Sequence, residues 1–172
     1  MSALPYIAKI VIPAAFTLLE EIARDLKHRA AGRLANPDAH RIMLAIGLQE
    51  SGFEHRRQMV RGPARSFYQA EPTGGFRGVI THPATRDLAR EVLKRAGYGE
   101  PDPSDFEAIE HGDIVSSCGA RLLLYTHPHA LPGPVDEDAA KLYYRDTWRP
   151  GHFRPEKWPG SWAGAIAELN RL

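Results

Sequence analysis

The chain has 172 residues and a formal net charge of +1, and 43% of its residues are apolar while 25% are charged. This length provides one substantial hydrophobic core and is short for two, so we expect a single domain over residues 1–172. The composition excludes a disordered chain and an integral membrane protein, and the balanced charge argues against nucleic acid as a partner.

The N-terminal segment predicts an extended entry followed by a helix over residues 14–31. Apolar residues recur there at helical spacing, and Gly32 is a suitable stop. Pro5 and Pro13 interrupt the apolar stretch, which is too short and broken to span a membrane. It also lacks a charged region before the apolar run and a small-residue cleavage site. We therefore expect neither stable membrane insertion nor a signal peptide.

A helix over residues 37–51 is predicted next, with Asn36 as its N-cap. An apolar stripe follows the i, i+3, i+4, i+7 pattern of a buried helix face: Ala39, Ile42, Met43 and Ile46. One more turn of this stripe reaches Glu50, so a carboxyl group is directed toward the core where the helix ends. Because burial disfavours the charged form, we expect Glu50 to have a raised pKa, as a general acid at neutral pH requires.

Residues 52–82 are rich in glycine and proline and predict loops, with one short hairpin near residues 67–76. A long irregular segment inside a compact domain is usually functional. This segment also carries a group of arginines: Arg56, Arg57, Arg61 and Arg65. They form either a basic patch that attracts an anionic polymer or a solvated loop whose arginines pair with nearby acids.

The remainder of the chain predicts helices joined by connectors. Pro83 opens a helix that ends near Gly97, and Ser104 caps a short helix that contains Ile109. A strongly apolar segment then predicts a central buried helix, in which Cys118 is a core residue rather than a nucleophile. The three last predicted helices cover residues 113–126, 136–148 and 159–169, with a rigid connector at 127–134.

The pair Glu50-Ser51 is followed by a Gly-containing turn and by the aromatic-Gln element that ends in Tyr68-Gln69. Together with the runs HRRQ and GPAR and with TWRPG at Thr147–Gly151, this order resembles the lysozyme-like lytic transglycosylases. The resemblance is closest to small phage and prophage proteins of that superfamily and covers the chain from about residue 12 to residue 162. The family's usual Ala-Tyr-Asn-Ala-Gly element is absent, and residues 123–128 take its place, with Tyr125 at the position of its tyrosine.

The resemblance implies a mainly α, lysozyme-like domain, with a long loop or short hairpin that lines a sugar cleft. It implies cleavage of the β-1,4 bond between MurNAc and GlcNAc in peptidoglycan, with Glu50 as the general acid and base. Ser51 and Gln69 would orient Glu50 or the substrate, and Tyr68 and Tyr125 would line the cleft. The product would carry a 1,6-anhydro-MurNAc end, and the reaction would need neither a cofactor nor a metal.

Other functions remain open at this stage. A hydrolytic muramidase would need a second carboxylate, for which Glu54, Glu71 and Asp146 are candidates. A non-catalytic virion or wall-binding protein on the same fold is a second alternative, and a nucleic-acid module lacks a base-stacking motif. The two histidines His127 and His129 have no third ligand in a recognisable motif, so we expect no metal site.

The resemblance also implies a place of action. We expect a monomeric phage or prophage product that is made in the host cytoplasm and acts on the peptidoglycan glycan strands of the periplasmic cell wall. Release by a separate membrane-permeabilising protein and transport within the virion both fit the sequence.

Overall fold

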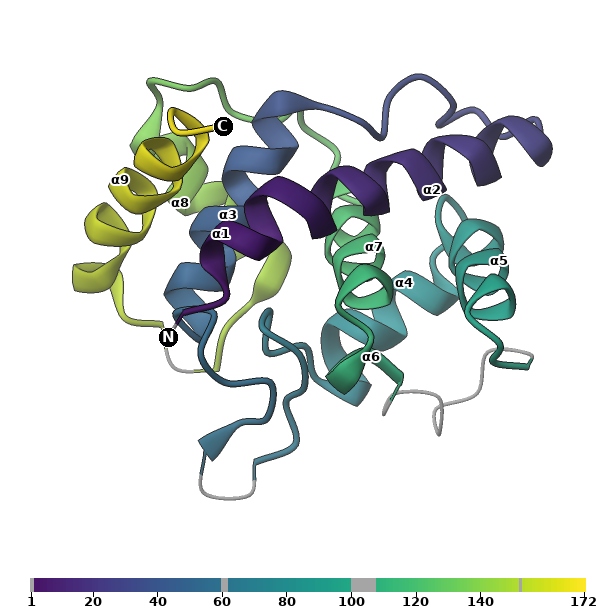
Figure 1. The fold of residues 1–172 in the computed structure, drawn as a ribbon, viewed down its shortest axis with the longest axis horizontal. Coiled ribbons are helices and arrows are strands. Elements are labelled where there is room, and N and C mark those ends of the chain that lie inside the picture. The colour runs from purple at the N-terminus through teal and green to yellow at the C-terminus, as the bar shows by residue number, and fades with distance from the viewer. Residues whose placement is uncertain (1, 60–61, 100–107, 152) are drawn as a thin grey trace.

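The computed structural model describes residues 2–59, 62–99, 108–151 and 153–172. Over these ranges the protein is mainly helical and contains no β-strand beyond isolated bridges, which confirms the predicted mainly α class (Figure 1). In the same ranges, every helix is either too short or too polar to cross a membrane.

The N-terminal helix is longer at its start and shorter at its end than the sequence predicts. Helix α1 (Leu4–Tyr6), a π-helical turn (Ile7–Val11) and helix α2 (Ile12–Asp25) form one rod that runs from left of centre to the upper right of the view (Figure 1). The predicted extended entry is wrong because both prolines lie where a helix tolerates them, in a first turn or directly after the π-helical turn. The rod ends at Asp25 rather than at residue 31, because Lys27 adopts a left-handed conformation with φ 50°.

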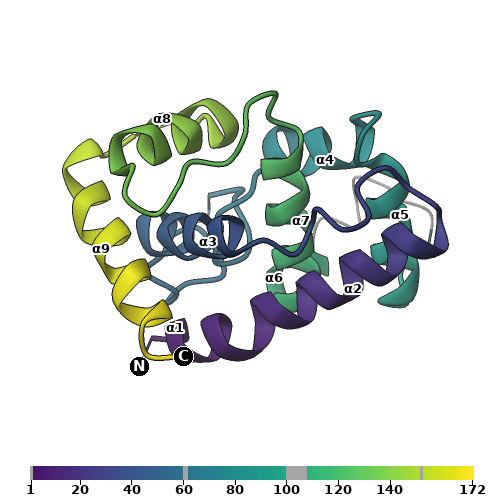
Figure 2. The same ribbon diagram turned by 90° about the horizontal axis from the view of Figure 1, so that it is seen from above.

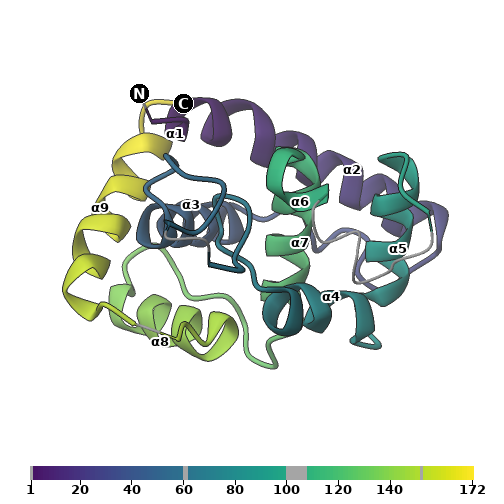
Figure 3. The same cartoon turned by 90° about the horizontal axis from the view of Figure 1, so that it is seen from below.

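Helix α3 (Pro37–Glu50) forms within one residue of its predicted bounds and lies at the centre of one half of the molecule. Its N-cap Asn36 accepts hydrogen bonds from the backbone N–H groups of Asp38 at 2.7 Å and Ala39 at 3.2 Å. The stripe that predicts a buried face is fully buried. Figures 2 and 3 show α3 between the N-terminal rod, α7 (Asp113–Tyr125), α8 (Glu137–Trp148) and α9 (Trp158–Leu169). The three later helices begin and end within one residue of their predicted bounds.

Two main hydrophobic clusters stabilise this arrangement. One surrounds α3 and contains the stacked rings of Tyr144, Trp158 and Trp162 from α8 and α9. The other lies between α2, α7 and α5 (Arg86–Arg95) and contains Cys118, which is fully buried as predicted. Burial raises the pKa of the Cys118 thiol, which excludes a reactive thiolate at neutral pH.

Two buried charged side chains fix the loop between α2 and α3. Glu20 accepts hydrogen bonds from the N–H groups of Gly32, Leu34 and Ala35 at 2.6 to 2.9 Å. Burial alone would raise the pKa of Glu20, but the three backbone donors together outweigh it and lower the pKa. Arg121 of α7 donates to the carbonyl oxygens of the same loop at 2.8 Å. Hydrogen bonds with buried side chains therefore fix both backbone N–H groups and backbone carbonyl groups of this loop.

Residues 52–82 are less irregular than predicted. Isolated bridges join Arg57 to Arg65 and Arg65 to Ala70, so the chain doubles back before the predicted hairpin near residues 67–76. Part of that predicted hairpin is instead a π-helical turn (Pro72–Phe76), which continues into α4 (Arg77–Thr81). Helix α5 starts three residues after Pro83 and ends at Arg95, two residues before Gly97, which adopts a left-handed φ of 87°. Helix α6 (Ala108–His111) contains Ile109, whereas its predicted cap at Ser104 lies outside the described residues.

Candidate active site

Glu50 is the last residue of α3, and the chain turns sharply after it. The C-cap Ser51 donates through Oγ to the carbonyl oxygen of Phe67 at 2.7 Å and accepts from the N–H of Phe53 at 3.2 Å. Phe53 adopts a left-handed φ of 55° and turns its ring back onto α3. The ring lies so close to Gly47 that a Cβ there would be 2.1 Å from Phe53 Cζ. Glycine at this position therefore permits the turn that places Glu50.

Among the described residues, the Glu50 carboxyl group has one hydrogen-bond partner, the hydroxyl of Tyr144 on α8. This hydroxyl donates to Glu50 Oε1 at 2.5 Å, a length typical of a hydrogen bond to an ionised acceptor. Tyr144 is buried, and its ring stacks on Trp158 with centroids 5.0 Å apart and an interplanar angle of 10°. A hydrogen bond that joins α3 to α8 in this way fixes the position of the carboxyl group.

Burial raises the pKa of Glu50 to about 7, in the direction that the sequence predicts. The hydrogen bond from Tyr144 and the positive charges of Lys157 and Arg154 lower it, whereas the negative charge of Glu71 adds to the rise. Lys157 also donates to the carbonyl oxygen of Gln49 at 3.2 Å, which ties the start of α9 to the end of α3. Glu50 is therefore partly protonated near neutral pH and can act both as an acid and as a base.

Glu50 lines a cleft of about 1350 Å³. The walls come from the end of α3, the loop that follows it, the connector after α7 and the connector between α8 and α9. All the candidate second carboxylates line the same cleft: Glu54, Glu71 and Asp146. The volume exceeds the usual size of a pocket for a single small molecule.

Two of the predicted site residues line the cleft with Glu50, and two do not. Ser51 and Gln69 lie in its wall. The cleft role predicted for Tyr68 is wrong, because its ring is buried and its hydroxyl lies 3.3 Å from Ser117 Oγ inside the core. The cleft role of Tyr125 is also wrong, since this half-buried residue packs in the cluster between α2 and α7.

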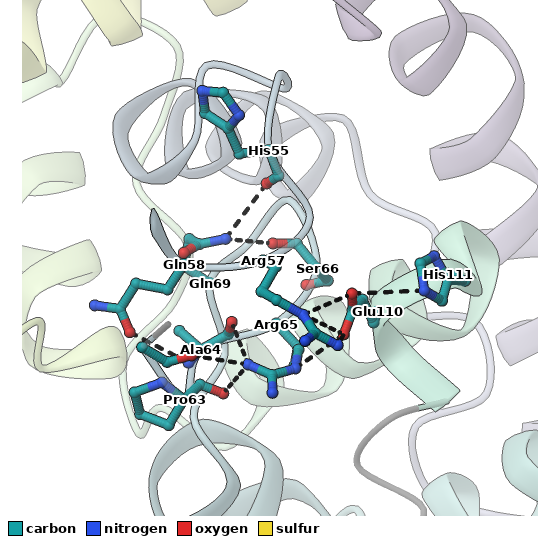
Figure 4. Close-up of polar contacts among 11 residues, drawn as sticks. His55, Arg57, Gln58, Pro63, Ala64, Arg65, Ser66, Gln69, Glu110 and His111 are labelled. Carbon is teal, nitrogen blue, oxygen red and sulfur yellow. Dashed lines mark hydrogen bonds and ion pairs between the residues drawn. The ribbon is translucent and has the colours of Figure 1, made fainter. Parts of the chain in front are cut away.

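The loop after Glu50 is fastened by polar contacts from within and from α6 (Figure 4). Gln69 Nε2 donates to the carbonyl oxygens of Ser66 at 2.8 Å and His55 at 3.3 Å. Ser66 and Gln69 both have left-handed φ values, 64° and 47°, which is uncommon for residues other than glycine. Gln69 thus holds the shape of the loop beside Glu50, and the strain at this position is of the kind found at functional sites.

The arginines of this loop pair with acids, which was one of the two interpretations left open by the sequence. Glu110 of α6 forms ion pairs with both Arg57 and Arg65, with N···O distances of 2.8 Å and 2.9 Å (Figure 4). The hydrogen bond from Arg57 holds the pKa of Glu110 below its ordinary value. Arg56 forms two hydrogen bonds with Asp113, at 2.9 and 2.7 Å. Arg61 lies outside the described residues.

A contact that the sequence analysis did not assign is the one between Tyr144 and Glu50. The sequence favours a core role for Tyr144, through its i, i+4 spacing with Trp148, and no short motif joins it to Glu50. In the part of the chain that the structure describes, no cluster of three histidine, cysteine, aspartate or glutamate side chains could hold a metal. His127 and His129 lie with ring centroids 5.4 Å apart.

Comparison of the chain with protein-family models, with curated proteins and with solved structures finds no significant match.

Proposed function

We propose that this protein cleaves the β-1,4 bond between MurNAc and GlcNAc in bacterial peptidoglycan, with Glu50 as the general acid and base. The single observation that carries the proposal is a carboxyl group with a pKa of about 7 in the wall of a cleft of about 1350 Å³. Glycosidic cleavage needs such an acid, because the leaving oxygen must receive a proton at near-neutral pH. The resemblance around Glu50-Ser51 and TWRPG supports the same chemistry.

In the proposed reaction, Glu50 donates its proton to the glycosidic oxygen while the bond from that oxygen to C1 breaks. The acetamido oxygen of the substrate then bonds to C1 and stabilises the positive charge, so no protein nucleophile is required. Glu50 is now a carboxylate that still accepts a hydrogen bond from the hydroxyl of Tyr144, and it removes the proton of the C6 hydroxyl. The C6 oxygen displaces the acetamido oxygen and leaves a 1,6-anhydro-MurNAc end.

A hydrolytic muramidase is the second candidate, and the position of Glu71 favours it. This carboxylate lines the cleft, and its negative charge adds a small contribution to the raised pKa of Glu50. A second carboxylate in the cleft could activate water or bond to C1, as in two-carboxylate glycosidases. The products would then have reducing ends.

The experiment is a digestion of purified peptidoglycan followed by mass spectrometry of the released muropeptides. We expect products lighter by one water than hydrolysed muropeptides. Glu50→Gln should lower the rate at least about a hundredfold while the protein stays folded. Glu71→Gln, a matched change in the same cleft, should keep substantial activity. If the unmodified protein releases products with reducing ends and the Glu71→Gln variant is inactive, the protein is a muramidase and not a transglycosylase.

A protein that binds glycan strands without releasing any product would be the non-catalytic alternative. In that case Glu50→Gln would leave the behaviour of the protein unchanged. Near-normal release of products by a folded Glu50→Gln variant would remove Glu50 from the chemistry altogether.

A further inference from the structure

A second depression, of about 700 Å³, adjoins the cleft that contains Glu50. It lies between the connector after α7 and the C-terminal end of α8. Both hollows are lined by the same five residues: His127, Pro128, Asp146, Arg149 and Pro150. The two hollows are therefore contiguous, and a group attached to a chain in the main cleft can reach directly into the second depression.

The lining of this depression is predominantly basic. It contains His127, His129, Arg145 and Arg149, against the single carboxylate of Asp146. Asp146 already has a cationic neighbour, because its Oδ1 lies 3.6 Å from Arg145 Nε. Among the described residues, no carboxylate lies within ion-pair distance of Arg149. The guanidinium at the junction of the two hollows is thus available to an anion from outside the chain.

The backbone holds Arg149 at this junction. It is the C-cap of α8 and adopts a left-handed conformation, φ 48° and ψ 53°, at a helix end where glycine is usually favoured. Its N–H donates to the carbonyl oxygen of Arg145, and its Nε donates to the carbonyl oxygen of Asp146 at 3.4 Å. These contacts restrain the start of the side chain and leave most of the planar guanidinium donors for a ligand.

We propose that this basic depression binds a free carboxylate on a peptide branch of the glycan strand whose backbone occupies the Glu50 cleft. The inference rests on the proposed function, and it assigns the specificity of that function to branched, carboxylate-bearing strands rather than to neutral amino-sugar polymers. An arginine guanidinium matches a carboxylate with two parallel hydrogen bonds. The nearby negative charge of Asp146 disfavours a ligand of higher charge, such as a phosphate.

The test is a binding measurement by isothermal titration with the full chain carrying Glu50→Gln, which prevents turnover of the ligand. Three defined probes are used: neutral tetra-N-acetylchitotetraose, a GlcNAc-MurNAc tetrapeptide with free carboxylates, and the same fragment with its carboxylates amidated. The three are titrated again after adding Arg149→Gln, and after adding Arg86→Gln as a matched loss of an exposed arginine on α5. Circular dichroism checks that each variant is folded.

We expect the free-carboxylate fragment to bind about fivefold more tightly than its amidated form, the scale of one exposed charge pair. Arg149→Gln should abolish this preference, whereas Arg86→Gln should preserve it. Equal affinity for the free and amidated fragments, or a preference that survives Arg149→Gln, would overturn the inference while leaving the proposed function intact. Failure of all three probes to bind would overturn the proposed function and this inference together.

Discussion

Replacing Glu50 by glutamine should stabilise the protein at alkaline pH. The folded state raises the pKa of this carboxyl from an ordinary value of 4.5 to about 7, chiefly by burial. The folded protein therefore binds a proton at Glu50 more tightly than the unfolded chain does, and stability falls as pH rises between these two values. At 1.36 kcal/mol per pH unit, the ionised carboxylate costs about 3 kcal/mol of folding free energy at pH 8. Glutamine has nearly the same shape, cannot ionise, and still offers an oxygen to Tyr144.

The assay is urea unfolding of the unmodified protein and of Glu50→Gln at pH 4 and at pH 8. The two proteins should have similar stability at pH 4, where Glu50 is mostly protonated in the folded and the unfolded state, and should differ by about 3 kcal/mol at pH 8. Glu54→Gln serves as the control for removing one negative charge from the cleft, because that side chain is 61% exposed. A stability difference for Glu50→Gln that does not change with pH would refute the burial of an ionisable group at this position.

Three further predictions concern the surroundings of Glu50 and the frame of the fold. Tyr144→Phe removes a donor to the carboxylate and should raise the pKa of Glu50 further, by about one unit, as measured by NMR titration. Gly47→Ala should destabilise the fold by about 1–3 kcal/mol in urea unfolding despite its higher helix propensity, because Phe53 must move. Glu20→Gln should be destabilising at pH 7, and the difference should shrink as pH falls from 4.5 through the lowered pKa of Glu20 in the folded protein.

The position of Glu50 could be predicted because it depends on local signals that the sequence carries. Asn36 caps α3, and the apolar period of the helix then determines which side of the last turn is buried. The raised pKa follows from that burial alone. The same periodicity predicts the later helices to within one residue of their bounds. The N-terminal helix is the exception, because periodicity gave neither its start at Leu4 nor its end at Asp25.

The orientation of side chains in the loop after Glu50 could not be predicted in this way. Ser66 and Gln69 have left-handed backbones without being glycine, and these two residues decide that Tyr68 enters the core while Gln69 reaches the cleft. No residue type in the sequence signals such a conformation. Likewise, the contact between Tyr144 and Glu50 spans 94 residues, so it depends on how α8 packs against α3.

Glu50 differs from two other buried carboxylates of this chain in its hydrogen-bond donors and in the direction of its pKa shift. Glu20 receives three backbone N–H donors, and Glu110 receives two arginines, so that in both cases the pKa falls and the charge is stabilised. Within the described ranges Glu50 has a single hydroxyl donor, and the positive charges of Arg154 and Lys157 do not offset the effect of its burial on the pKa. A carboxyl group left short of donors is a cost to folding, and here it is exposed to a cleft large enough for a polymer. A general acid and base must release and recover a proton near neutral pH, and that requirement would account for the cost.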